Sequence, residues 1–364
     1  MIPFPEQTGE SLLFSLRSLY GGYGYSRYKM NKFEEYDLYA HNKDFLISDS
    51  VITFTDGSGK LLALKPDVTL SIVKNSVDSE NTTQKLYYNE NVYRVTKGSR
   101  NFKEIMQVGL ECIGKIDDYC IYEVLKLALE SLNEIRKPNV LSVSHLGLLS
   151  EVMDRAGIPE NKKTEVFRCI GEKNLHELTA VCDAAGADNG IIEVLRQLVK
   201  INGETGTVLT EIRSLLEGIV NPAVLDGFSR VMSSLSHEPN LRIDFSVVGD
   251  IKYYNGFVFK GFAEGIPSGV LSGGQYDTLM KKMGKKSGAI GFAVYLDTVE
   301  QFIRKSEEFD VDTVLIYDET SSPEQIGKQL REIAAGGKRV LAATSVPQQI
   351  KYGKLVRMSG GKAE

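Results

Sequence analysis

Strand-like patterns lie on both sides of a long helical stretch, and this interruption constrains the fold more than any other feature of the sequence. Residues 148–236 read as successive amphipathic helices, most of them closed by glycine, with no strand-like alternation. Alternating apolar and polar positions occur before residue 140 and resume in LRIDFSVVGDIKYYNGFVFKGF. The sequence therefore predicts a core built from residues 1–147 and 237–304, interrupted by a helical insertion at 148–236.

Several elements of the first 140 residues can be predicted individually. VITFTDGSGKLLALKPD reads as two strands joined by a DGSG turn, and KLYYNENVYRV and FKEIMQVGLECIG read as two more strands around the polar loop TKGSRN. Helices are expected in GESLLFSLRSLYGG, ending at Gly21-Gly22, and in DDYCIYEVLKLALESLNEI, which Pro138 follows. The core thus mixes strands and helices.

The tail after the hydrophilic joint RKSEEFDVD has a compact βαβ pattern. The strands TVLIY and RVLAA flank a helix with Ser322 as its N-cap, Pro323 in its first turn, Gln325 at the third position and Gly336 beyond its end. Too little sequence follows Ala343 for a large α/β domain. We therefore expect a short C-terminal α/β domain at residues 311–364.

Composition excludes several classes of function. The net charge of −5 and the pI near 5.6 match poorly a protein that grips nucleic acid through its phosphates. The four cysteines form no C-x-x-C pair and are expected to be reduced and mostly buried, and the four scattered histidines argue against a zinc site. No signal peptide and no membrane-length apolar run is found, so the cytoplasm is the expected location.

Motifs for nucleotide loops and hydrolytic sites are also absent. No G-x-G-x-x-G follows a strand, and the GKKS at 284–287 lacks the earlier glycine of a phosphate-binding loop, where Leu279 stands. Neither a G-x-S-x-G elbow nor H-E-x-x-H occurs. No cofactor or metal is therefore predicted.

Four separated segments carry polar side chains on strand-like patterns: LKPDVTLSIVKN, QVGLECIG, IKYYNGFVF and LSGGQYDTLMKKMGKKSGAIGFAVYLD. Gln107 and Glu111 are four apart and would share one face of a strand, whereas adjacent tyrosines on a strand would point to opposite faces. If the strands converged, these groups would suit a small zwitterion with an ammonium group and a ring N–H. Ordinary polar pairing between strands is the alternative. The residues that such a pocket would use are Asp67, Thr69, Gln107, Glu111 and Tyr254.

These segments, in this order, resemble the core of histidyl-tRNA synthetase over residues 1–304. LKPDVT is similar to L-R-P-E-G-T, QVGLE to Q-x-G-x-E, and IKYYNGFVF to L-D-Y-Y-T-G-x-x-F. SGGQYD and AIGFAVYLD are similar to G-G-R-Y-D and A-x-G-F-A-x-G-L-E-R, and the tail resembles a shortened anticodon-binding domain. The resemblance implies an α+β, class II synthetase-like fold whose antiparallel sheet is flanked by helices.

The departures from that pattern concern positive charge. Gly249 stands where the family's activating arginine is expected, with no arginine between Ile243 and Phe262. Thr298 replaces the arginine that holds ATP and Gln275 the arginine of G-G-R-Y-D, so that only Arg94 can be matched as an anion contact. Losing one well-placed electrostatic group typically lowers a rate by ~10²–10³. We therefore expect a pocket that binds an amino acid without activating it, and no catalytic residues.

A chain of this kind resembles the regulatory subunits of ATP phosphoribosyltransferase. That resemblance implies a non-catalytic homodimer that joins the short catalytic subunit at the first step of histidine biosynthesis, with histidine as feedback effector. A divergent histidyl-tRNA synthetase and a stand-alone histidine sensor are the alternatives. Asp67 is one methylene shorter than the family's glutamate, which would withdraw its carboxylate by ~1.3 Å and weaken hydrogen bonds. By resemblance, the histidine-contacting residues are Asp67, Thr69, Gln107, Glu111, Tyr253, Tyr254 and Tyr276.

Overall fold

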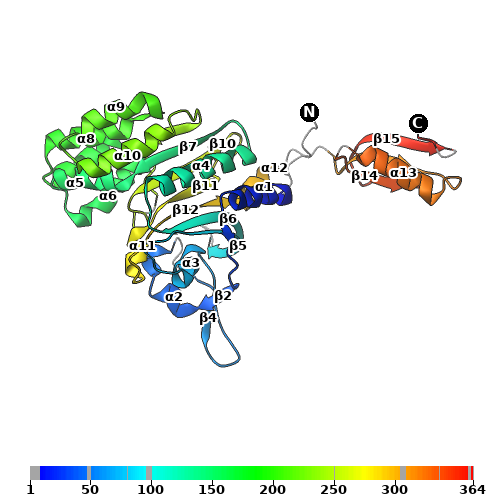
Figure 1. Ribbon diagram of the computed structural model, residues 1–364, viewed down its shortest axis with the longest axis horizontal. Coiled ribbons are helices and arrows are strands. Elements are labelled where there is room, and N and C mark those ends of the chain that lie inside the picture. Colours follow the sequence, from blue (N-terminus) through cyan, green and yellow to red (C-terminus); the bar gives the residue numbers. More distant parts are fainter. Residues whose placement is uncertain are drawn as a thin grey trace. The chain divides into compact units, whose positions relative to one another are not determined.

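The computed structural model describes residues 9–46, 51–79, 81–95, 101–249, 251–303, 309–335, 337–359 and 362–363 (Figure 1). The chain divides into two compact units. The larger is Leu13–Val299, and the smaller combines Met1–Leu12 with Glu300–Glu364. Each unit is described by itself.

A nine-stranded sheet forms the centre of the larger unit, in the order β1-β5-β6-β12-β11-β10-β7-β9-β8. Most neighbouring strands are antiparallel, while β1 with β5 and β7 with β9 are parallel. Strands from before and after the helical stretch join in one sheet, and most of its neighbouring strands are antiparallel, which confirms the α+β prediction. The strands are β1 (Ser26–Arg27), β5 (Gln84–Val95), β6 (Phe102–Gly114), β7 (Asn139–His145), β8 (Asn202–Glu204), β9 (Leu241–Asp244), β10 (Phe257–Ala263), β11 (Leu271–Gln275) and β12 (Gly288–Tyr295).

Strand register aligns distant parts of the sequence. On β6, Glu111 faces Leu86 of β5 on one side and Gly291 of β12 on the other. Further along, Gln107 pairs with Tyr295. The polar loop between β5 and β6 is only partly covered, since residues 96–100 lie outside the described residues.

One long amphipathic helix packs against the middle of the sheet. Helix α4 (Asp118–Ile135) contacts β7, β10 and β12 and buries most of its apolar side chains. It begins where predicted, because the Asp117 side chain accepts a hydrogen bond of 2.9 Å from the backbone N–H of Cys120. At the start of the chain, α1 (Gly9–Gly22) ends at the predicted glycine pair, and Gly24, with φ of 81°, follows.

Six helices and one short strand occupy the stretch predicted as an insertion, and they gather at one end of the sheet (Figure 1). The strand β8 departs from the expectation of helices alone. It pairs antiparallel with β9 and thereby extends the sheet edge by one strand. The stretch belongs to the same compact unit as the sheet. Its helices are α5 (Leu146–Arg155), α6 (Glu160–Gly171), α7 (Leu175–Ala184), α8 (Asn189–Lys200), α9 (Thr205–Leu216) and α10 (Pro222–Ser234).

A small three-stranded sheet, in the order β2-β4-β3, lies beside the main one. Strands β3 (Thr53–Thr55) and β4 (Leu61–Leu64) form the predicted hairpin. The Asp56 carboxylate fixes the turn by accepting hydrogen bonds from the N–H groups of Ser58 and Lys60 at 2.8 and 2.9 Å. The remaining elements of this region are β2 (Phe33–Glu35), α2 (Tyr36–Ala40), the 3₁₀ turn η1 (Lys43–Phe45), α3 (Thr69–Asn75) and α11 (Asp277–Lys282).

The smaller unit has the predicted βαβ start. Strand β13 (Val311–Ile316) pairs parallel with β14 (Val340–Ala343), and α13 (Pro323–Ala334) connects them. Ser322 and Gln325 form the expected capping box, whereas Gly336 lies outside the described residues. A further strand, β15 (Tyr352–Ser359), adds to β13 in parallel, followed by β16 (Lys362–Ala363). Helix α12 (Leu296–Ile303) links the two units in sequence. Among the described helices, none is long and apolar enough to cross a membrane.

Candidate functional site

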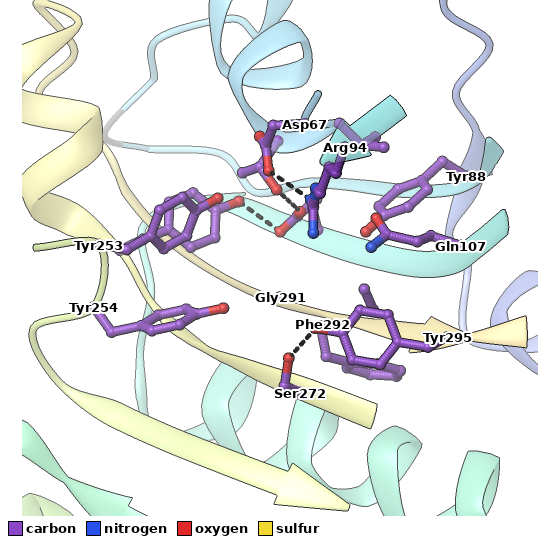
Figure 2. A pocket seen from close by; sticks show the side chains of 15 residues that line it. Asp67, Tyr88, Arg94, Gln107, Tyr253, Tyr254, Ser272, Gly291, Phe292 and Tyr295 are labelled. Carbon is purple, nitrogen blue, oxygen red and sulfur yellow. Dashed lines mark hydrogen bonds and ion pairs between the residues drawn. The ribbon is translucent and has the colours of Figure 1, made fainter. Parts of the chain in front are cut away.

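All eight predicted site residues line one cavity of about 70 Å³ in the larger unit (Figure 2). They come from the start of α3, from β5 and β6, and from the segments around β10 and β11. The sequence places them up to 209 positions apart, so only the sheet brings them together. They are Asp67, Thr69, Arg94, Gln107, Glu111, Tyr253, Tyr254 and Tyr276.

The Glu111 carboxyl group lies at the centre of the hydrogen bonding in this cavity. Thr69 Oγ1 donates to its Oε1 at 2.8 Å, and Tyr276 Oη donates to its Oε2 at 2.6 Å. The side chain is 2% exposed. Opposite it, Gly291 leaves the necessary room, since a Cβ atom there would stand 1.8 Å from Glu111 Oε2. Each carboxyl oxygen is therefore held by one hydroxyl group.

Burial raises the pKa of both acids in the pocket. It raises the pKa of Glu111 to about 8, against the lowering effect of the hydrogen bonds from Tyr276 and Thr69. Burial also raises the pKa of Asp67, opposed by the neighbouring Arg94 charge. The pKa of Tyr276 is raised well above its ordinary value by burial, so the phenol remains a hydrogen-bond donor. Without a ligand, Glu111 is mostly protonated at neutral pH.

Arg94 is the only cationic side chain among the described residues that line the cavity, and protein groups already engage it. Its Nε donates to the carbonyl oxygen of Pro66 at 2.6 Å. Its Nη2 lies 3.6 Å from Asp67 Oδ2, while Asp67 Oδ1 accepts a hydrogen bond of 2.9 Å from the N–H of Leu70. The Arg94 side chain is 11% exposed and lines the cavity.

The two adjacent tyrosines both line the cavity, and the strand interpretation of their segment was wrong. The described residues between β9 and β10 contain no strand, so the opposite-face rule does not apply to them. The rings of Tyr253 and Tyr254 lie 4.8 Å apart at 65°, and Tyr253 also contacts Tyr276 at 5.7 Å. Asn255 helps to fix this loop, because its side-chain oxygen accepts a hydrogen bond of 2.9 Å from the backbone N–H of Asp277.

Gln275 and Gly249, which stand where the resemblance expects arginine, stabilise the local backbone instead. Gln275 Oε1 accepts a hydrogen bond of 2.9 Å from the N–H of Phe257, at the start of β10. Gly249 has φ of 55°, and a Cβ atom there would lie 2.9 Å from Val258 and 3.2 Å from Tyr254. A long cationic side chain at Gly249 would therefore be strained and crowded. Thr298 lies in α12 and does not line the cavity.

Sequence reasoning missed several residues of the cavity wall. Tyr88 is six positions before Arg94 on β5, and this even spacing could have placed both side chains on one face. Ser272 and Tyr295 could not be found that way, because their meeting depends on strand register. Their hydroxyl groups lie 2.6 Å apart. The wall residues missed by sequence reasoning are Val68, Tyr88, Ser272, Gly291, Phe292, Ala293 and Tyr295.

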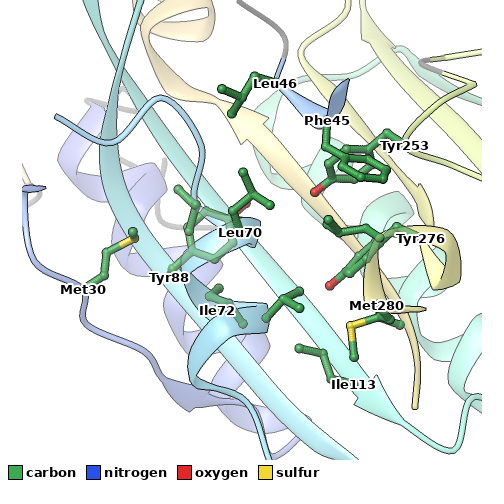
Figure 3. Close-up of a cluster of buried hydrophobic side chains, with 14 of the residues drawn as sticks. Met30, Phe45, Leu46, Leu70, Ile72, Tyr88, Ile113, Tyr253, Tyr276 and Met280 are labelled. Carbon is green, nitrogen blue, oxygen red and sulfur yellow. The ribbon is translucent and has the colours of Figure 1, made fainter. Parts of the chain in front are cut away.

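A cluster of buried apolar side chains supports the pocket (Figure 3). Tyr88, Tyr253 and Tyr276 belong to both, so their rings are packed on one side and face the cavity on the other. All four cysteines are buried free thiols, as predicted. Among the residues that the structure describes, no group of three or more histidine, cysteine, aspartate or glutamate side chains could hold a metal ion.

Comparison with known proteins agrees with the fold. The histidyl-tRNA synthetase family model matches residues 4–299. The ATP phosphoribosyltransferase regulatory subunit of Oceanobacillus iheyensis is 23% identical over 97% of this chain and 89% of its own length. The histidine–tRNA ligase of Methanocaldococcus jannaschii is 25% identical over 86% of this chain and 76% of its own.

Solved structures confirm the predicted fold. An ATP phosphoribosyltransferase regulatory subunit/histidyl-tRNA synthetase from Bacillus halodurans superposes with a TM-score of 0.73 at 21% identity, covering 96% of this chain and 93% of that one. The ATP phosphoribosyl transferase (HisG:HisZ) complex from Thermotoga maritima has a chain that matches with a TM-score of 0.60 at 20% identity. The match covers 78% of this chain and 96% of that one. Because the family model spans most of its length, the chain belongs to the histidyl-tRNA synthetase family.

Proposed function

We propose that this chain binds L-histidine in the cavity without activating it, and that it acts as the regulatory subunit of ATP phosphoribosyltransferase. One observation carries the proposal. Among the described residues, the cavity lining combines two buried carboxyl groups and several hydroxyl groups with a single cation that Asp67 and Pro66 already engage. Such a lining suits the ammonium and ring N–H groups of histidine and is poor in groups that would hold a triphosphate.

The lining offers a partner for each polar group of histidine. Asp67, Thr69 and Gln107 would meet the ammonium group, and Glu111 with Tyr254 would meet the imidazole ring. Arg94 would face the carboxylate, although its bonds to Pro66 and Asp67 limit how far it can move. The shorter Asp67 side chain already accepts a hydrogen bond from Leu70 and pairs with Arg94. Because these contacts compete with the ligand, a modest affinity is expected.

Histidine binding should release a proton, because the bound imidazole N–H favours an ionised Glu111. With a pKa of about 8 for Glu111 in the empty pocket, the affinity should rise roughly fivefold from pH 7 to pH 8 and less than about twofold above pH 8. Calorimetry at pH 7 in phosphate and in Tris should give different apparent enthalpies, by an amount that reports the released proton. Equal enthalpies in the two buffers and a flat pH profile would contradict this linkage.

The names of the relatives support the partner proposal. The O. iheyensis relative is called a regulatory subunit, and the T. maritima structure is a HisG:HisZ complex. We propose that this chain dimerises through its synthetase-like core and joins short catalytic subunits of the transferase. Histidine would then bias the complex between active and inhibited arrangements, with a coupling free energy of ~1–3 kcal/mol, which is typical of allostery.

Mixing the purified chain with the short catalytic subunit tests this proposal. The two proteins should co-elute in gel filtration, the rate of phosphoribosyl-ATP formation should rise, and added histidine should lower it. The matched control is the catalytic subunit alone, at the same concentration and with the same histidine additions. Separate elution together with an unchanged rate would rule out the regulatory role.

A divergent histidyl-tRNA synthetase is the second candidate, and it is favoured by the family match and by the M. jannaschii relative. It predicts charging of tRNA with histidine and tight binding of both histidine and ATP. A stand-alone histidine sensor predicts histidine binding alone, with no effect on the transferase. Paired calorimetry with histidine and ATP, followed by an aminoacylation assay, separates these candidates from the regulatory subunit.

A further inference from the structure

Tyr295 closes the wall of the cavity that lies across from Tyr253 and Tyr254 (Figure 2). It is the last residue of β12, and its backbone N–H donates to Val270 O at 2.9 Å. Its hydroxyl group lies 2.6 Å from Ser272 Oγ on the neighbouring strand β11. The ring is therefore fixed at both ends, by the sheet at its backbone and by Ser272 at its hydroxyl.

The residue type at this position is unusual for the pattern that the chain otherwise follows. AIGFAVYLD is similar to A-x-G-F-A-x-G-L-E, in which the position of Tyr295 is glycine. The first glycine of the pattern is kept as Gly291, where a side chain would collide with Glu111. At the second, a hydrogen atom has been replaced by a phenol group that lines the cavity. The added volume therefore fills space that glycine would leave open.

The distribution of charge shows which part of a ligand would meet this ring. If Glu111 and Asp67 take the ring N–H and the ammonium group, the carboxylate of the ligand must point away from them. It then faces the side of the cavity that Ser272 and Tyr295 line, across from Asp67 (Figure 2). A free carboxylate fits there, but a group attached to that carboxylate would have to extend past the fixed phenol ring.

We infer that Tyr295 is a size filter, which admits a free amino acid and excludes an amino acid joined through its carboxylate to a nucleoside. This inference rests on the proposed function and adds to it a steric barrier that is independent of the missing cations. The filter would keep the regulatory site from being occupied by aminoacyl nucleotides.

The test compares two ligands on the full-length chain and on variants of Tyr295. L-Histidine and the stable adenylate mimic 5′-O-(N-L-histidylsulfamoyl)adenosine are titrated calorimetrically into the full-length chain, Tyr295→Gly and Tyr295→Phe. The measured quantity is the ratio of the dissociation constant of the mimic to that of histidine. Tyr295→Gly should lower this ratio by about 10- to 100-fold, the range expected when one buried side chain's worth of contact area becomes available to a ligand. Tyr295→Phe keeps the ring and should change the ratio by less than about fivefold.

The outcomes separate the filter from the proposed ligand. A wild-type chain that binds the mimic at least as tightly as histidine, or a glycine variant that gains no affinity for it, would overturn the filter. If the wild type binds no histidine while Tyr295→Gly gains the mimic, the filter stands and the proposed effector falls. Because glycine weakens strands, Tyr295→Ala is measured in parallel, and melting temperatures confirm that each variant is folded.

Discussion

Gly291→Ala is expected to reduce histidine affinity by about 100-fold, because the displaced Glu111 would lose its charge-assisted hydrogen bond to the imidazole and its bonded neighbour Thr69 would be disturbed beside the ammonium group. The new methyl group would stand 1.8 Å from Glu111 Oε2 and 2.4 Å from the carbonyl oxygen of Leu110. The carboxyl group would have to leave its position, and with it would go the bonds from Thr69 and Tyr276. Calorimetry with histidine measures the loss.

The backbone contact also predicts a loss of stability in Gly291→Ala. Overpacking a well-filled interior typically costs ~1–3 kcal/mol, so the melting temperature should fall while the protein remains folded. Gly206→Ala is the matched control. A Cβ atom at Gly206, in α9, meets nothing within 4 Å, so this change should leave histidine binding intact and the melting temperature equal or slightly higher. Full histidine affinity in Gly291→Ala would show that the position of Glu111 is unimportant.

Glu111→Gln should weaken histidine binding by about 10- to 100-fold, the effect of removing a hydrogen bond of ~1.5–3 kcal/mol to an ionised group. The amide has nearly the same shape but cannot ionise. Histidine binding to this variant should therefore release no proton from this site and lose the rise in affinity between pH 7 and pH 8. The pH series and the comparison of buffers measure both effects.

The same substitution has a different effect on folding, and the sign follows from the direction of the pKa shift. The folded chain holds the Glu111 proton more tightly than the unfolded chain, since burial raises the pKa from 4.5 to about 8. The stability that depends on this carboxyl is therefore present below pH 4.5 and declines as the pH rises toward 8. Glu111→Gln lacks that decline, so its free energy of unfolding should fall less than that of the wild type between pH 6 and pH 8.5.

Glu123→Gln is the control for this second variant. Glu123 is also 2% exposed, but it binds Lys85 at 2.7 Å and Tyr25 at 3.1 Å outside the cavity. Its replacement should destabilise the chain, because Lys85 loses its partner, without changing the ratio of histidine affinities between pH 7 and pH 8. A similar loss of histidine affinity in both glutamine variants would point to general damage to the fold rather than to a role in binding.

Features set by neighbouring residues were predictable from the sequence. The capping box of Ser322 and Gln325 and the Asp56 turn depend on contacts between residues two to four positions apart, and both are present. Elements that depend on pairing with distant residues could not be predicted in this way, and β8 is an example. Residues 202–204 look like a link between helices, yet they pair with β9 and form the sheet edge.

The pocket shows the same division. The resemblance of four short segments to family motifs selected eight residues that do line one cavity. Local periodicity misjudged Tyr253 and Tyr254, because they lie in a loop in which strand alternation has no meaning. Lys65 is another case: its charge suggests exposure, but it is 1% exposed and pairs with Glu90. Packing against residues far away in sequence decides such positions.

The interrupted order of the main sheet has a consequence for how the protein is made. Asp67, Arg94 and Glu111 precede the helical stretch α5–α10, whereas Tyr254, Tyr276 and Tyr295 follow it. A chain emerging from the ribosome carries half of the cavity for a long interval before the other half is synthesised. If histidine is the ligand, as proposed, it would stabilise only polypeptides completed beyond Tyr295 and would not assist the early steps of folding.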